Sequence, residues 1–250
     1  MTLGPAATSV IPVKSKLSAR WNVTPAQARD IQLSLRDRVE RRDRMGTLRR
    51  VAGADVALDL ARGQAIAGVV VYRFPAMEEI ERVWQESPLE FPYIPGLLSF
   101  REMPAILAAF ERVRSQPDMI FYDGHGFAHP RRFGIACHLG VALDCPTIGC
   151  AKSRLIGVPA EPPEERGGWV RLEDKGETIG AVLRTRTGVR PIYVSTGHWV
   201  SLERAVDLVL AVSGPYRIPR PTRDADHFVG EIKRKNRSQP GDGPVHPDEF

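Results

Sequence analysis

The segment that most constrains the fold is a short apolar stretch that breaks into a polar turn containing glycine. Residues 119–122 (Met-Ile-Phe-Tyr) favour a β-strand, and Asp123, Gly124, His125 and Gly126 follow directly. A buried strand is rigid and the loop after it is accessible, so a carboxylate placed there can serve a functional site. The same residues are also typical of an ordinary strand that ends in an Asp-Gly turn. The choice depends on whether other acids in the chain can join Asp123.

Composition allows one α/β domain with a full core, because the chain has 250 residues and is 42% hydrophobic. The excess of 35 basic over 30 acidic residues weakly favours a polyanionic partner. No apolar run approaches the ~20 residues needed to cross a membrane, and no Lys or Arg precedes the weakly apolar N-terminal stretch. Cys137, Cys145 and Cys150 lack CxxC spacing, which predicts reduced core residues. We therefore expect a cytoplasmic protein without membrane contact, and nothing indicates an obligate protein partner.

The first part of the chain predicts a helix followed by an antiparallel meander. Thr24 and Gln27 have the spacing of a capping box, with Pro25 at the first helical position, and the helix is expected to end at Gly46. Three strand-like segments then follow with short turns between them, at residues 48–58, 65–74 and 79–85.

The second part predicts alternating helices and strands. A second capping box, Ser99 to Glu102, is expected to open a helix that runs to Arg114. The remaining expected elements are a strand at 118–122, a helix at 133–143, strands at 146–150 and 192–195, and a helix at 201–212. A meander followed by such units gives a mixed sheet, antiparallel and parallel, flanked by helices, as in the ribonuclease-H-like arrangement. We expect one folded domain over residues 21–231, between a flexible leader (1–20) and a disordered basic tail (232–250).

Three further acids are candidates to join Asp123. Asp55 interrupts an apolar strand, where a lone carboxylate is costly unless it is paired or binds a cation; the alternative is an edge-strand acid that faces solvent. Glu102 occupies the third position of its capping box, and that structural role could by itself explain why an acid stands there. Asp226 follows a proline-rich turn, and it could instead be an acid on a helix whose side chain faces solvent. Carboxylate oxygens are the ligands that Mg²⁺ prefers, whereas zinc-ligand, P-loop and serine-nucleophile patterns do not occur.

Four segments, in chain order, resemble the endonuclease V family of nucleases, which act at deaminated purines. They are residues 51–56 (Val-Ala-Gly-Ala-Asp-Val), 92–102 (Pro-Tyr-Ile-Pro-Gly-Leu-Leu-Ser-Phe-Arg-Glu), 123–140 (from Asp-Gly-His-Gly to His-Leu-Gly) and 149–155 (Gly-Cys-Ala-Lys-Ser-Arg-Leu). Gly197-His198 and residues 216–226 extend the match, so that it covers roughly residues 20–230. The resemblance implies a ribonuclease-H-like fold and a nuclease that depends on Mg²⁺, with Mn²⁺ able to substitute.

The resemblance also implies catalytic roles. Asp55, Glu102 and Asp123 match the family's catalytic acids, which hold the metal and so activate a water, and Asp226 matches a position near that metal. Lys152 matches a lysine that would face the scissile phosphate.

Substrate-binding roles follow from the same resemblance. Tyr93, in the turn formed with Pro92, Ile94 and Pro95, matches a wedge that fills the space left by a displaced base. A turn bracketed by prolines suits a wedge because its shape is fixed before binding. The residues that match the base pocket and the nearby strand contact are Gly96, Leu98, Gly124, Leu155 and His129. Arg131 and Arg132 could hold the strand or form a solvated surface pair.

The implied function is an endonuclease that recognises inosine (hypoxanthine) in DNA and initiates repair. It would hydrolyse the second phosphodiester bond on the 3′ side of the lesion and leave 3′-hydroxyl and 5′-phosphate ends. Two alternatives stay open: a module that binds deaminated bases without cutting, and a ribonuclease-H-like nuclease acting mainly on RNA or branched DNA. Clustered acids repel phosphate, which argues against a pure binding module. Inosine-containing RNA is a further candidate partner, and His125 has no assigned role.

Overall fold

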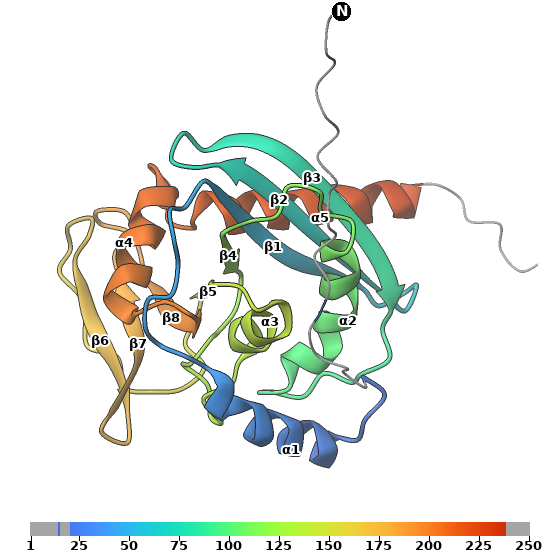
Figure 1. Ribbon diagram of the computed structural model, residues 1–250, viewed down its shortest axis with the longest axis horizontal. Helices are drawn as coiled ribbons and strands as arrows, with labels where there is room; N and C mark the ends of the chain where they lie inside the picture. Colours follow the sequence, from blue (N-terminus) through green and yellow to red (C-terminus); the bar gives the residue numbers. More distant parts are fainter. Residues whose placement is uncertain (1–14, 16–20, 239–250) are drawn as a thin grey trace, which may run out of the picture.

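An eight-stranded mixed sheet forms the centre of the protein in the computed structural model, which describes Ser15 and residues 21–238 (Figure 1). Its strand order is β3-β2-β1-β4-β5-β8-β7-β6. The antiparallel meander is confirmed and consists of β1 (Arg50–Asp59), β2 (Gln64–Arg73) and β3 (Glu78–Pro88). Two parallel strands follow it, β4 (Met119–Tyr122) beside β1 and β5 (Thr147–Ala151) beside β4. This mixed order agrees with the ribonuclease-H-like α/β fold expected from the sequence.

The edge of the sheet away from the meander contains a hairpin that the sequence analysis missed. It consists of β6 (Trp169–Asp174) and β7 (Glu177–Leu183), and β8 (Ile192–His198) joins it to β5. Lys175 and Gly176 connect the two hairpin strands with φ angles of 55° and 79°. Two-residue turns with positive φ match the twist of paired strands and favour glycine, so Lys175-Gly176 was the local signal for this hairpin.

Helices cover both faces of the sheet. On one face lie α2 (Leu98–Phe110) and α3 (Ile135–Leu143), and on the other lie α4 (Leu202–Ser213) and α5 (Arg220–Ser238). Consecutive residues of β4 alternate between the two cores: Ile120 and Tyr122 pack with α2 and α3, whereas Met119 and Phe121 pack with α4 and α5. Because both faces are buried, such a strand has a continuous apolar sequence.

The first helix is shorter than expected. α1 (Pro25–Leu35) begins with the predicted capping box of Thr24 and Gln27, but only a 3-10 turn (Arg36–Arg38) follows it. The prediction of a helix up to Gly46 was therefore wrong. The chain beyond α1 instead makes backbone hydrogen bonds to the end of β8, from Trp199 to Glu40 and from Arg44 to Trp199. These tertiary contacts, which the local sequence does not contain, hold Glu40 and Arg44 beside the end of β8.

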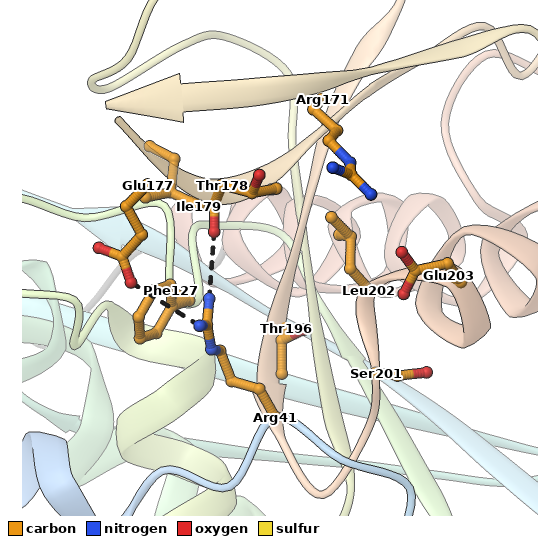
Figure 2. A pocket seen from close by; sticks show the side chains of 11 residues that line it. Arg41, Phe127, Arg171, Glu177, Thr178, Ile179, Thr196, Ser201, Leu202 and Glu203 are labelled. Carbon is orange, nitrogen blue, oxygen red and sulfur yellow. Dashed lines mark hydrogen bonds and ion pairs between the residues drawn. The ribbon is translucent and has the colours of Figure 1, made fainter. Parts of the chain in front are cut away.

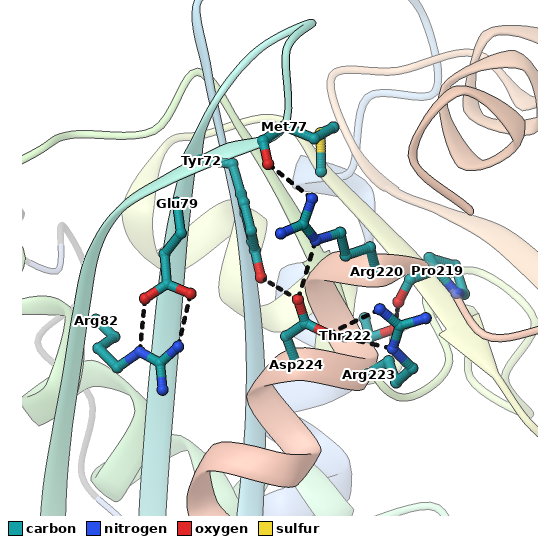
Figure 3. Close-up of polar contacts among 9 residues, drawn as sticks. All are labelled: Tyr72, Met77, Glu79, Arg82, Pro219, Arg220, Thr222, Arg223 and Asp224. Carbon is teal, nitrogen blue, oxygen red and sulfur yellow. Dashed lines mark hydrogen bonds and ion pairs between the residues drawn. The ribbon is translucent and has the colours of Figure 1, made fainter. Parts of the chain in front are cut away.

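Helix α5 was not predicted, and it extends past the expected start of the tail. Residues 232–238 are helical rather than disordered, while residues 239–250 and most of the leader (1–14 and 16–20) lie outside the described residues. Figure 3 shows how α5 is attached to β2: the buried Tyr72 hydroxyl donates a 2.7 Å hydrogen bond to Asp224, which also accepts from Arg220 and Arg223.

Two glycines let α5 approach the sheet closely. A Cβ at Gly53 in β1 would lie 2.0 Å from the backbone oxygen of Pro221, and one at Gly68 in β2 would lie 2.5 Å from Val229. Only residues without a side chain fit there. The start of α5 therefore lies in backbone contact with β1.

Two simpler expectations can be compared with the described residues. The three cysteines are free thiols, as predicted. Within Ser15 and residues 21–238, the helices are too short or too polar to cross a membrane.

Candidate active site

Asp55, Asp123 and Asp226 converge at one end of the parallel strands. One carboxylate oxygen from each lies within 4.8 Å of the others. Asp55 and Asp123 are neighbours because Ala54 of β1 pairs with Tyr122 of β4, one residue earlier in each strand. Asp226 reaches them because α5 lies directly on β1. The cluster brings together three of the acids expected from the sequence, although the helix that supplies the third was not foreseen.

The electrostatics of this cluster favour a cation. Burial raises the pKa of Asp55 well above its usual range, and the charges of Asp123 and Glu102 raise it further. Burial also raises the pKa of Asp123, against the lowering effect of Lys152. Like charges held together in a half-buried place are stabilised by a hard divalent cation, and oxygen ligands suit Mg²⁺ or Mn²⁺. The donor set therefore fits the expected metal.

Lys152 joins the acids, as the sequence analysis expected. It follows β5, and its ammonium group lies 2.6 Å from Asp123 and 3.0 Å from Asp226. Burial disfavours the charged ammonium, but the hydrogen bonds and charges of the two carboxylates outweigh burial and raise the pKa of Lys152. Because its side chain is 43% exposed, this permanent positive charge is accessible from solvent.

Glu102 does not cap its helix, so the predicted capping box was wrong. The N-cap of α2 is Leu97, without a side-chain hydrogen bond, and Ser99 and Glu102 both lie inside the helix. The Glu102 carboxylate accepts a 2.7 Å hydrogen bond from the hydroxyl of Tyr122. Burial raises the pKa of Glu102 to about 7, opposed by that hydrogen bond and assisted by the charge of Asp123. Glu102 thus lies near the three-acid cluster but outside it.

A cavity of about 240 Å³ adjoins the acids, since its wall includes the residues that follow Asp123 and Lys152 in the chain. Every predicted substrate-binding residue lines it except Pro92, which is exposed: Tyr93, Ile94, Pro95, Gly96, Leu98, Gly124, His129 and Leu155. The lining residues that the sequence analysis left unassigned are Gln32, Ser99, His125, Gly134, Ile135, Ser153 and Arg154. His125 lies between Gly124 and Gly126 in the segment that matches the family. Its position next to Gly124, a predicted pocket residue, was a sequence signal that it lines the cavity.

The turn over the cavity has anchored ends and a projecting ring. Phe91 and Leu97, on either side of the turn, are buried in one apolar cluster with Phe100 and Ala28. The side chain of Tyr93 between them is 70% exposed. An aromatic ring in this position is free to contact a ligand.

The two arginines after His129 are both held by the protein. Arg131 donates to Gln32 and to the backbone oxygen of Gly96. Arg132 forms ion pairs with Asp174 and Glu177 of the β6–β7 hairpin, with only 18% of its side chain exposed. The solvated-pair alternative is therefore wrong.

A second, larger hollow of about 320 Å³ lies between β7, β8 and the start of α4, and it contains none of the predicted site residues (Figure 2). Arg41 lies over the ring of Phe127, 3.9 Å from its centroid, and donates to the backbone oxygen of Thr178. Arg41 is also close to Glu177, at 3.7 Å. Arg41 is thus held in this hollow by Phe127, Thr178 and Glu177.

Known proteins resemble this chain in sequence and in fold. The family model for endonuclease V matches residues 33–227. The chain is 50% identical over 216 residues to endonuclease V of Roseiflexus sp. (strain RS-1), covering 86% of this chain and 96% of that one. The crystal structure of endonuclease V from Streptomyces avermitilis superposes with a TM-score of 0.84 at 38% identity, over 91% of this chain and 100% of that one. Ciona intestinalis endonuclease V, solved with a 24mer DNA containing an inosine followed by a ribo-adenosine, gives a TM-score of 0.74 at 28% identity, over 84% and 98% of the two chains. The chain belongs to the endonuclease V family of nucleases.

Proposed function

We propose that this protein is a Mg²⁺-dependent endonuclease that recognises inosine in DNA and cuts the second phosphodiester bond on its 3′ side. The products would carry 3′-hydroxyl and 5′-phosphate ends, and the cut would initiate repair. The observation that carries the proposal is that the acid cluster and the lysine beside it continue directly into the cavity wall, from Asp123 to Gly124 and from Lys152 to Ser153. The inosine-containing DNA bound by the relative from Ciona intestinalis supports the choice of substrate.

Recognition would require the damaged base to leave the stack. Extrusion costs a few kcal/mol and is cheapest for a mispaired base. The cavity has backbone groups of Gly96 and Gly124 in its wall, which can approach the edge of a base closely because glycine has no side chain. The exposed ring of Tyr93 would occupy the gap left in the DNA duplex and stack on the neighbouring bases.

Each of the clustered side chains would have a separate role in the reaction. Asp55, Asp123 and Asp226 would hold Mg²⁺, which supplies Lewis acidity and an activated water when bound. Lys152 contributes a positive charge that stabilises the negative charge growing on the phosphate. Glu102, oriented by Tyr122, adds a further carboxylate beside the cluster.

The test is a comparison of matched oligonucleotides that carry one inosine: single-stranded DNA, duplex DNA and RNA, each with Mg²⁺ and with EDTA. We expect one cut per inosine strand with Mg²⁺ and none with EDTA. Inosine DNA that is bound but remains intact would favour the non-cleaving alternative, and cutting confined to the RNA would favour the ribonuclease-H-like alternative. Asp123→Asn should abolish cutting while retaining binding, because it removes one charge and little volume.

A further inference from the structure

The backbone oxygen of Gly96, at the end of the turn that carries Tyr93, accepts hydrogen bonds from three side chains. The donors are Gln32 at 3.1 Å, His129 at 2.9 Å and Arg131 at 2.6 Å. This turn has few backbone donors of its own, because Pro92 and Pro95 lack an N–H group. Among the described residues, the side chains that bond to this turn do so through its carbonyl oxygens.

Gln32 connects this turn to the segment around Gly134, another part of the cavity wall. It lies on α1 and is only 1% exposed. The nitrogen of its amide donates to Gly96 and also, at 3.2 Å, to the backbone oxygen of Phe133, directly before the lining residue Gly134. Its oxygen accepts from Arg131 at 2.6 Å. Since a guanidinium can only donate, Arg131 fixes the orientation of the amide.

His129 completes the arrangement as a neutral donor. Its Nδ1 accepts from the backbone N–H of Arg131 at 3.2 Å, which leaves the proton on Nε2, facing Gly96. The contacts to Gly96 thus come from groups that are themselves oriented by other hydrogen bonds. A turn held in this way is rigid before any ligand arrives.

We propose that Gln32 is a positioning residue for the Tyr93 turn, and that it lets the protein open a base-paired duplex at inosine. The inference rests on the proposed function. The Tyr93 ring can keep two bases apart only if the turn that carries it keeps its position. Loss of Gln32 therefore matters most where a base pair has to be broken, and least where the inosine is already unpaired.

Gln32→Met is the decisive variant, because methionine has a similar length and cannot donate or accept in this way. The matched control is Gln27→Met on the same helix, which removes half of the capping box of α1 and leaves the turn untouched. Single-turnover cutting is measured on inosine paired with cytosine in duplex DNA and on the same strand alone. A second readout, taken with EDTA, is the fluorescence of 2-aminopurine beside the inosine, which reports unstacking without any cut.

For Gln32→Met we expect duplex cutting to fall about tenfold more than single-strand cutting, which corresponds to about 1.4 kcal/mol, the net value of one hydrogen bond. The 2-aminopurine signal on duplex DNA should fall as well. Gln27→Met should change both substrates equally.

Equal losses on both substrates for Gln32→Met, or no loss, would overturn the inference and leave the proposed function intact. If the unmodified protein cuts no inosine strand, the proposed function fails, and the 2-aminopurine signal still decides whether Gln32 supports the wedge. Should Gln32→Met fail to fold, Gln32→Glu offers the same test, since it keeps the acceptor for Arg131 but loses both donated hydrogen bonds.

Discussion

Replacing Gly53 by alanine should separate α5 from the sheet and so disturb the acid cluster from a distance. The added Cβ would lie 2.0 Å from the backbone oxygen of Pro221, whereas ordinary contact begins at 3.4 Å. A backbone group cannot rotate away as a flexible side chain can, so the start of α5 must move. Asp226, which lies five residues after Pro221 on α5, would move with it.

The expected cost is about 3 kcal/mol in the free energy of unfolding. Overpacking a core typically costs about 1–3 kcal/mol. Displacement of α5 also removes part of the burial of Phe228 and Val229, and full burial of such a side chain contributes about 1.5–3 kcal/mol. For a chain of this size, a loss of 3 kcal/mol lowers the melting temperature by about 6–12 °C.

Urea unfolding measures the stability, and calorimetric titration with Mg²⁺ measures the effect on the cluster. We expect metal binding to weaken by roughly tenfold, the lower end of what misoriented ligands usually cost. Gly230→Ala is the matched control on α5 itself: its nearest neighbour would be Arg234 at 3.7 Å, so it should stabilise the helix by about 0.5–1 kcal/mol. The reasoning is refuted if Gly53→Ala unfolds within about 1 kcal/mol of the unmodified protein.

Three further predictions concern single side chains. Lys152→Met should lower the rate of cutting by about 10²–10³-fold, the usual cost of losing one electrostatic contact to a reacting group. The affinity for inosine DNA, measured by gel shift, should stay within a few fold. An unchanged cutting rate would exclude the role of Lys152 at the phosphate. Because burial raises the pKa of Glu102 to about 7, the stability that its neutral form contributes is present below its ordinary pKa and is lost as the pH rises through 7. Glu102→Gln should therefore gain stability relative to the unmodified protein between about pH 5 and pH 8, measured by urea unfolding in EDTA, and a constant difference across that interval would contradict the pKa shift. Tyr72→Phe removes a 2.7 Å hydrogen bond to Asp224 and should cost about 1–2 kcal/mol in urea unfolding, whereas Tyr216→Phe, at an exposed ring, should cost almost nothing.

Features that depend on near neighbours in the chain could be predicted from the sequence. The meander followed from apolar segments separated by short turns, and the capping box at Thr24 followed from a four-residue pattern. The matched segments around Asp55, Asp123 and Lys152 located the acids and the lysine, and the structure places these three side chains together. The expected lining of the cavity followed from the same segments, because its walls are largely the loops that continue from those strands.

Contacts between side chains that are distant in the sequence could not be predicted from local patterns. Asp226 joins the cluster because Gly53 and Gly68 admit α5 to backbone contact with the sheet, and Gln32 reaches the Tyr93 turn because α1 packs beneath it. The apparent capping box at Glu102 failed because the helix begins at Leu98, which leaves Glu102 to bond with Tyr122. Local patterns record the preferences of a segment for helix, strand or turn. The distance between two side chains far apart in the sequence depends instead on how closely whole elements pack.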